Sequence, residues 1–121
     1  METNNEYWGL STHINLYACD KALISSAEQI KNYVIELCDR IEVKRYGDPM
    51  LVHFGERDEI AGYSLVQLIE TSSITGHFVD HNGDAYIDVF SCKFYNAEEV
   101  VAFTKTFFSA SEVVFDVIKR K

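Results

Sequence analysis

The sequence contains little of what secreted, membrane-spanning or nucleic-acid-binding proteins need. Its three cysteines, Cys19, Cys38 and Cys92, are an odd number without a CxxC pair, so they indicate neither a disulfide framework nor a zinc knuckle. No apolar stretch approaches the roughly 20 residues that span a bilayer, and the polar segment Met1–Tyr7 does not resemble a signal peptide. Basic residues are few, 11 against 19 acidic ones, and the formal charge of −8 disfavours nucleic acid and anionic membranes as partners. We therefore expect a cytoplasmic protein.

Linkers and familiar catalytic fingerprints are absent as well. One proline and no low-complexity tract in 121 residues predict a single domain over 1–121. The sequence has no GxGxxG, no P-loop and no GxSxG motif, so it does not resemble common nucleotide-binding or hydrolase folds. His77 and His81 have a metal-chelating spacing for a helix, but on a strand they lie roughly 13 Å apart, too far for one ion. We expect no metal site.

Helical periodicity occurs in two segments. The first predicted helix is capped by Ser25, with Glu28 completing an S-x-x-E capping box. Its buried stripe is formed by Ile30, Val34, Leu37, Cys38 and Ile41. The second predicted helix begins at Asn96, with Glu99 three residues later as a partial capping box. Its apolar face is formed by Val100, Phe103, Phe107 and Phe108.

Short apolar runs between turn residues predict strands. They cover 12–17, 41–46, 50–54, 63–70, 74–79, 85–90 and 112–118. The run at 63–70 is nearly continuous in apolar residues, which predicts a strand covered on both faces. Asn82-Gly83 predicts a tight hairpin, because both residues tolerate positive φ. The charged segment Gly55–Ile60 is expected to be an exposed loop.

The order of these elements predicts an α+β fold. It is a two-layer sandwich, in which both helices cover one face of a mainly antiparallel sheet. The other face of the sheet stays uncovered in a single chain. If that face is apolar, burying it against a second copy is the simplest solution, so we expect a homodimer.

Two serines, a histidine and a cysteine are separated by characteristic intervals in the middle of the chain. Ser64 and Ser72 are eight residues apart, Ser72 and His77 are five apart, and His77 and Cys92 are fifteen apart. Cys92 is the final residue of the run Asp88-Val89-Phe90-Ser91-Cys92. This pattern resembles the short prokaryotic form of S-adenosylmethionine decarboxylase, a self-processing pyruvoyl enzyme of spermidine synthesis. The resemblance also covers Gly9, the run Leu16–Asp20 and the segment 62–93.

The resemblance implies self-cleavage between Thr71 and Ser72, giving chains 1–71 and 72–121. The Ser72 hydroxyl would attack the Thr71 carbonyl to form an ester, with Ser64 holding the intermediate by a hydrogen bond. His77 would act as general base on the α-proton of residue 72. Elimination and loss of ammonia would leave a pyruvoyl cofactor at position 72, which binds the substrate amine as a Schiff base. Cys92 would then donate a proton to the carbanion left by carbon dioxide.

The substrate side of the resemblance is less complete. Phe54 resembles the aromatic residue on which the family stacks the adenine of S-adenosylmethionine. Thr71 stands where the family has Glu, and Ser73 stands where it has His. The family's Thr-Trp-Pro-Glu, whose Glu holds the ribose, is replaced by the run 78–81, in which Asp80 is the nearest carboxylate.

Three interpretations therefore stay open. The first is a decarboxylase of S-adenosylmethionine. The second is a pyruvoyl decarboxylase of a basic amino acid such as arginine or ornithine. The third is an unprocessed relative that serves as a binding or regulatory subunit.

The spacing of Ser72 and His77 sets a geometric condition on this scheme. They differ by an odd number, so a regular strand would point them to opposite faces of the sheet. The scheme requires either that Ser72 lies in the turn before the strand or that Gly76 forms a bulge.

Overall fold

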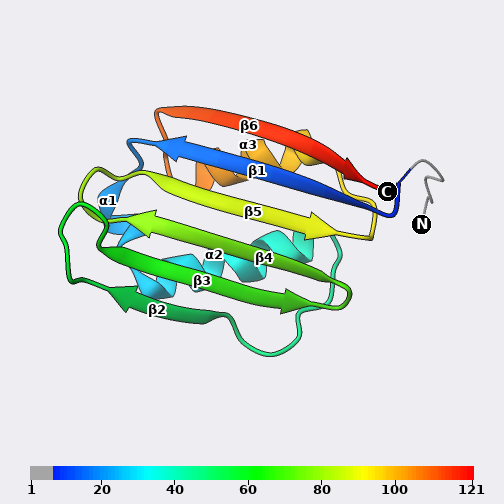
Figure 1. Cartoon of the computed structure of the whole chain (residues 1–121), viewed down its shortest axis with the longest axis horizontal. Helices are drawn as coiled ribbons and strands as arrows, with labels where there is room; N and C mark the ends of the chain where they lie inside the picture. Colours follow the sequence, from blue (N-terminus) through cyan, green and yellow to red (C-terminus); the bar gives the residue numbers. More distant parts are fainter. Residues whose placement is uncertain (1–6) are drawn as a thin grey trace.

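The sheet and its helices account for most of the chain. The computed structural model describes residues 7–121; the expectation drawn from the start of the chain lies outside them, apart from Tyr7. The elements are β1 (Gly9–Tyr17), α1 (Lys21–Ile24), α2 (Ala27–Arg40), β2 (Met50–Phe54), β3 (Gly62–Ile69), β4 (Ser72–Val79), β5 (Ala85–Ser91), α3 (Ala97–Phe107) and β6 (Glu112–Arg120). The six strands form one sheet in the order β2-β3-β4-β5-β1-β6, with every neighbouring pair antiparallel. Helices α2 and α3 lie behind this sheet in Figure 1. The predicted α+β two-layer fold is confirmed.

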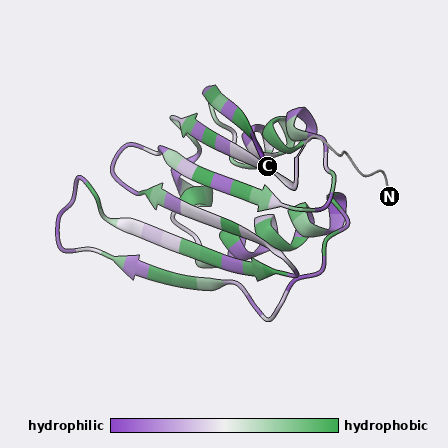
Figure 2. Ribbon diagram, turned by 45° about the vertical axis from the view of Figure 1, so that its right-hand side comes forward, coloured by the Kyte–Doolittle hydropathy of each residue, from purple (hydrophilic) through white to green (hydrophobic). Residues whose placement is uncertain are grey.

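The core lies between the sheet and the two long helices. Hydrophobic and hydrophilic segments alternate along several strands in Figure 2, as expected for strands with one covered face. Ile14, Ile74 and Ile87 are almost completely buried on the helical side. The two helices are joined by a hydrogen bond between the Tyr33 and Thr104 hydroxyls, at 2.7 Å. Of the predicted α2 stripe, all members except Ile41 are buried.

The helix starts agree only in part with the predictions from the sequence. The Asn96 side chain accepts a hydrogen bond from the Glu99 amide at 3.0 Å, as predicted for α3. For α2 the predicted cap was wrong by one residue, because the Ser26 hydroxyl accepts from the Gln29 amide. Ser25 instead ends the short helix α1, which the periodicity did not reveal. A helix of this length is too short to produce an apolar stripe.

The predicted strand at 41–46 is not formed. Glu42 has a φ of +57°, which interrupts an extended backbone, and only Arg45 makes an isolated bridge, to Ile69. The hairpin predicted around Asn82-Gly83 is formed by β4 and β5, but its turn is wider than predicted. Gly83 has a φ of +78°, but the hairpin closes through the wider bond from the Val79 amide to the Asp84 carbonyl.

The face of the sheet away from the helices is open in the single chain. On β3 the residues facing the helices, Leu65, Gln67 and Ile69, are buried, whereas Val66 and Leu68 are 42% and 54% exposed. The prediction that this strand is covered on both faces is therefore wrong for one copy. Exposed apolar side chains continue onto the edge strand β2, at Met50, Val52 and Phe54. Within residues 7–121, no helix combines the length and apolarity needed to cross a membrane.

Candidate active site

The turn between β3 and β4 holds the expected cleavage point. Ile69 pairs with Ser72, so Glu70 and Thr71 form the turn and Ser72 is the first residue of β4. Thr71 has a φ of +59°. That conformation costs a residue other than glycine about 1–2 kcal/mol and is unusual for a β-branched one. The Thr71–Ser72 peptide bond therefore follows a strained residue.

Cys92 lies directly beside this turn. Its Sγ is 2.7 Å from the Thr71 Oγ1, while the Thr71 hydroxyl lies 2.6 Å from the Glu70 carbonyl oxygen. A carbonyl can only accept, so the single Thr71 proton goes to Glu70. A protonated Cys92 would then be the donor to Thr71, which is the arrangement that a proton donor beside the cleavage point requires.

The Ser72 hydroxyl has a partner that the sequence analysis missed. It donates to the Ser91 Oγ at 2.9 Å, and Ser91 is buried opposite Ser72 in the β4–β5 ladder. The Ser91 Oγ also accepts from the Lys93 amide at 3.0 Å. Ser91 belongs to the run 88–92 that carries the resemblance, so the sequence did contain a signal for this residue.

Ser64 and His77 are brought together on the open face. They are opposite each other in the β3–β4 ladder, and the Ser64 Oγ is 3.1 Å from the His77 Nδ1. The His77 Nε2 is 3.3 Å from the Ile60 carbonyl oxygen. Because this carbonyl can only accept, we assign the proton of neutral His77 to Nε2. Nδ1 then accepts from the Ser64 hydroxyl and is the nitrogen available as a base.

Ser72 and His77 do not meet within one chain. Gly76 pairs with both Leu65 and Ile87 in an unbroken register, so β4 has neither a bulge there nor a Ser72 displaced into the turn. Five residues along a strand span roughly 16 Å, and the odd number places the two side chains on opposite faces. Ser72 opens β4 at the end where β3 and β5 finish, whereas His77 lies near the opposite end of β4 (Figure 1). The described chain thus contains two separate clusters, Thr71–Ser72–Cys92 and Ser64–His77.

A hollow of about 400 Å³ adjoins His77. It is lined by Phe54, Glu56, Ile60 and His77, so the structure places the predicted adenine-binding Phe54 beside the predicted base. Asp80, in contrast, is bound to the His53 Nε2 through Oδ2 at 2.7 Å. The His53 side chain lies on the opposite face of β2 from Phe54 and packs edge-on against Tyr63. The contact between His53 and Asp80 therefore lies toward the helical side of the sheet.

Comparisons with known proteins identify the family of the chain and a similar fold. The family model described as S-adenosylmethionine decarboxylase matches residues 10–121. The chain belongs to the S-adenosylmethionine decarboxylase family. Its fold is similar to the crystal structure of the adenosylmethionine decarboxylase from Aquifex aeolicus VF5, with a TM-score of 0.80 and 20% identity, covering 94% of this chain and 91% of that one. No curated protein sequence matches the chain significantly.

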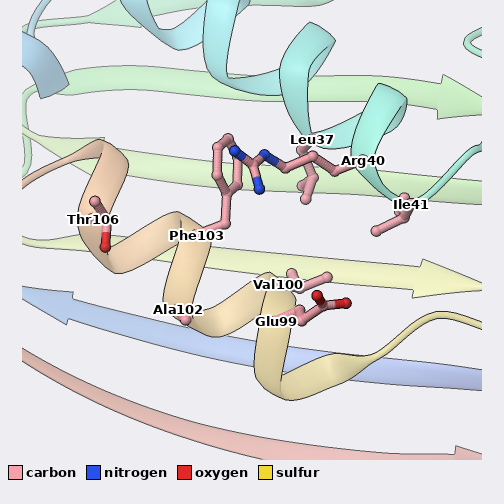
Figure 3. A pocket seen from close by; sticks show the side chains of 8 residues that line it. All are labelled: Leu37, Arg40, Ile41, Glu99, Val100, Ala102, Phe103 and Thr106. Atoms are coloured by element: carbon pink, nitrogen blue, oxygen red, sulfur yellow. The ribbon is translucent and has the colours of Figure 1, made fainter.

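This member of the S-adenosylmethionine decarboxylase family has a second hollow besides the one beside His77. That hollow, of about 410 Å³, lies between α2 and α3 on the helical side (Figure 3). Its lining is Leu37, Arg40, Ile41, Glu99, Val100, Ala102, Phe103 and Thr106. The Arg40 guanidinium sits 4.5 Å from the centre of the Phe103 ring, so its charge already has a partner. This hollow contains no cysteine or histidine that could act as a nucleophile or base.

Across 7–121, no three His, Cys, Asp or Glu side chains are grouped so that they could hold an ion. The three cysteines are free thiols, and burial raises the pKa of both Cys19 and Cys38 to about 11. Cys19 and Cys38 lie in the core and Cys92 lies at the turn, which separates the packing thiols from the candidate proton donor.

Proposed function

We propose that this family member is a self-processing, pyruvoyl-dependent decarboxylase of S-adenosylmethionine. The observation that carries the proposal is the strained residue Thr71, in the turn immediately before Ser72, with the Cys92 thiol against it. The proposal is supported further by the Ser64–His77 pair, at the interval from Ser72 that the family resemblance requires.

Self-cleavage would use the groups at the turn. The Ser72 hydroxyl attacks the Thr71 carbonyl carbon, which moves the acyl group from nitrogen to oxygen. A base of the kind formed by His77 removes the α-proton of residue 72, and the carboxylate of Thr71 leaves. Water then displaces ammonia from residue 72 and completes the pyruvoyl group. The turn is exposed at Thr71, so the released chain end is free to move away.

The residues around position 72 suit the cofactor that this cleavage would generate. A pyruvoyl group supplies a carbonyl that accepts electrons as carbon dioxide leaves the substrate. The Cys92 thiol lies against residue 71, and in its protonated form it would deliver a proton at this end of β4. Ser91 holds the side chain of residue 72 in the intact chain.

We further propose a homodimer in which each active site is completed by the second copy. Within one chain the base lies roughly 16 Å along β4 from the residue on which it must act. The open face of the sheet carries Ser64 and His77, together with exposed apolar side chains such as Val66 and Leu68. Burying this face against a second copy removes apolar surface from water and gives His77 a route to the turn of the partner chain. A cytoplasmic location suits the three free thiols.

A decarboxylase of arginine or ornithine is the second candidate. It is favoured by the absence of the family's Trp and Glu at 79 and 81, where this chain has Val79 and His81. The two candidates are separated by measuring carbon dioxide release from S-adenosylmethionine, arginine and ornithine in parallel. We expect release from S-adenosylmethionine alone. Release from a free amino acid, with none from the nucleoside, would replace the first candidate by the second.

A further inference from the structure

The hollow beside His77 combines apolar walls with one carboxylate. Phe54 and Ile60 are 57% and 55% exposed and supply its apolar surface. Glu56 is the only acidic side chain in its lining. It lies in the loop between β2 and β3, at the left of the sheet in Figure 1.

The Glu56 carboxylate is not occupied by another group. The basic residue of the same loop, Arg57, is engaged by the Glu59 Oε1 through Nη2 at 2.7 Å and Nε at 3.1 Å. Among residues 7–121, Glu56 itself takes part in no hydrogen bond or ion pair. Asp80 contacts His53 through Oδ2, and its Oδ1 is buried, although no described residue hydrogen-bonds to it. Of these two carboxylates, Glu56 is therefore the one available to a ligand beside His77.

A carboxylate at the edge of an aromatic and aliphatic hollow suits a particular kind of ligand. Its charge attracts a cation, and the apolar walls favour a cation that carries carbon substituents over one that is strongly hydrated. A sulfonium, in which a positive sulfur carries three carbons, has both properties. A neutral thioether of the same shape lacks the charge.

We propose that Glu56 is the carboxylate that binds the positive charge of the substrate, so that this hollow selects a sulfonium over a thioether. This inference rests on the proposed function, because it places the nucleoside substrate in the hollow beside His77. This contact with the sulfonium differs from the ribose contact for which Asp80 is the nearest carboxylate in the sequence.

Two nucleosides that lack the aliphatic amine and the carboxyl group of S-adenosylmethionine test the inference. 5′-Methylthioadenosine is a neutral thioether, and its S-methylated form is a sulfonium of nearly the same shape; neither can react with a pyruvoyl group or lose carbon dioxide. Their affinities are measured by calorimetry for the wild-type protein and for the variants Glu56→Gln, Asp58→Asn and Asp80→Asn. Asp58→Asn is the matched control, since it removes one negative charge from the same loop outside the lining of the hollow.

The wild-type protein should bind the sulfonium about fivefold more tightly than the thioether, the range expected for a solvent-exposed ion pair. Glu56→Gln should abolish this preference by weakening only sulfonium binding, and Asp58→Asn should keep it. The inference is overturned if Glu56→Gln keeps the preference, if it weakens both probes equally, or if Asp80→Asn removes the preference instead. In those three cases the proposed nucleoside substrate still stands. Binding of neither probe to the wild-type protein would overturn the nucleoside substrate itself, and this inference with it.

Discussion

Proton positions at single residues determine what the two clusters can do. Each cluster contains a carbonyl oxygen, of Glu70 or of Ile60, that can only accept a hydrogen bond. With a protonated Cys92 and a neutral His77, these acceptors make the thiol a donor and His77 Nδ1 an acceptor. The acid and the base of the proposed mechanism are thus distinguished by their backbone neighbours.

Replacing Cys92 tests the role of the donor. Cys92→Ala should lower carbon dioxide release by about 10²-fold or more, because the carbanion loses its positioned acid. Self-cleavage should continue, since the thiol takes no part in ester formation or elimination. Turnover per mole of processed chain and a denaturing gel measure the two effects separately.

Cys38→Ala is the control for this change. Cys38 lies in the core, so its removal should lower the free energy of unfolding while turnover of the folded protein stays close to that of the wild type. If Cys92→Ala changed only stability in the same way, Cys92 would be a packing residue and not the proton donor.

At the scale of elements, the β3–β4 turn is the feature on which processing depends. Thr71 adopts a left-handed conformation that glycine would adopt without strain. Cleavage releases this strain, because residue 71 becomes a free chain end. The strain should therefore assist self-cleavage, in addition to whatever the side chains contribute.

Thr71→Gly is expected to slow self-cleavage. In a Ser72→Ala background, which stays uncleaved, Thr71→Gly should raise the free energy of unfolding by up to about 1 kcal/mol, after allowing for the larger unfolded-state entropy of glycine. The rate is followed on denaturing gels, and the stability by urea unfolding.

Ser109→Gly provides the comparison, because Ser109 has a φ of +52° at the end of α3, away from both clusters. It should raise stability similarly and leave the cleavage rate unchanged. Equal slowing by both substitutions would mean that general stability, and not the strain at Thr71, sets the rate.

The sequence predicts those elements whose signal is local. The Asn96 cap of α3, the apolar stripe of α2 and most strands follow from periodicity and side-chain chemistry within a few residues. The strand expected at 41–46 fails because Glu42 adopts a positive φ that the apolar pattern does not reveal. The tight turn lies at Glu70–Thr71 and not at Asn82-Gly83, because the ladder register decides which hairpin closes with the fewest residues.

The candidate site can be predicted from the sequence only in part. Linear intervals locate Ser64, Ser72, His77 and Cys92, but they do not reveal which side chains meet. Ser91 and Glu56 become visible only through the strand register and the loop path, which depend on contacts distant in sequence. The odd interval between Ser72 and His77 did predict that they face opposite sides of a regular strand.

At the scale of the whole molecule, the separation of the two clusters predicts an active site shared between copies. A chain with Ser72→Ala keeps its base, and a chain with His77→Ala keeps its cleavable turn. Each variant alone should stay intact. When both are expressed together at equal levels, random pairing should place about half of the His77→Ala chains in mixed dimers, where they should be cleaved.

Mass spectrometry of the mixed sample identifies which variant has been cut. Failure of the mixed sample to cleave, combined with a monomer mass in light scattering, would contradict the shared site. In that case His77 would have to reach Ser72 within one chain by a rearrangement of β4.

The central claim, self-processing at the strained turn, is tested most directly by the intact mass of the purified protein after prolonged incubation. The account predicts two chains, residues 1–71 and residues 72–121. The second should be lighter, by one ammonia, than the same segment beginning with an unmodified serine. A single undiminished chain of 121 residues would contradict the claim and favour an unprocessed binding or regulatory protein of the same family.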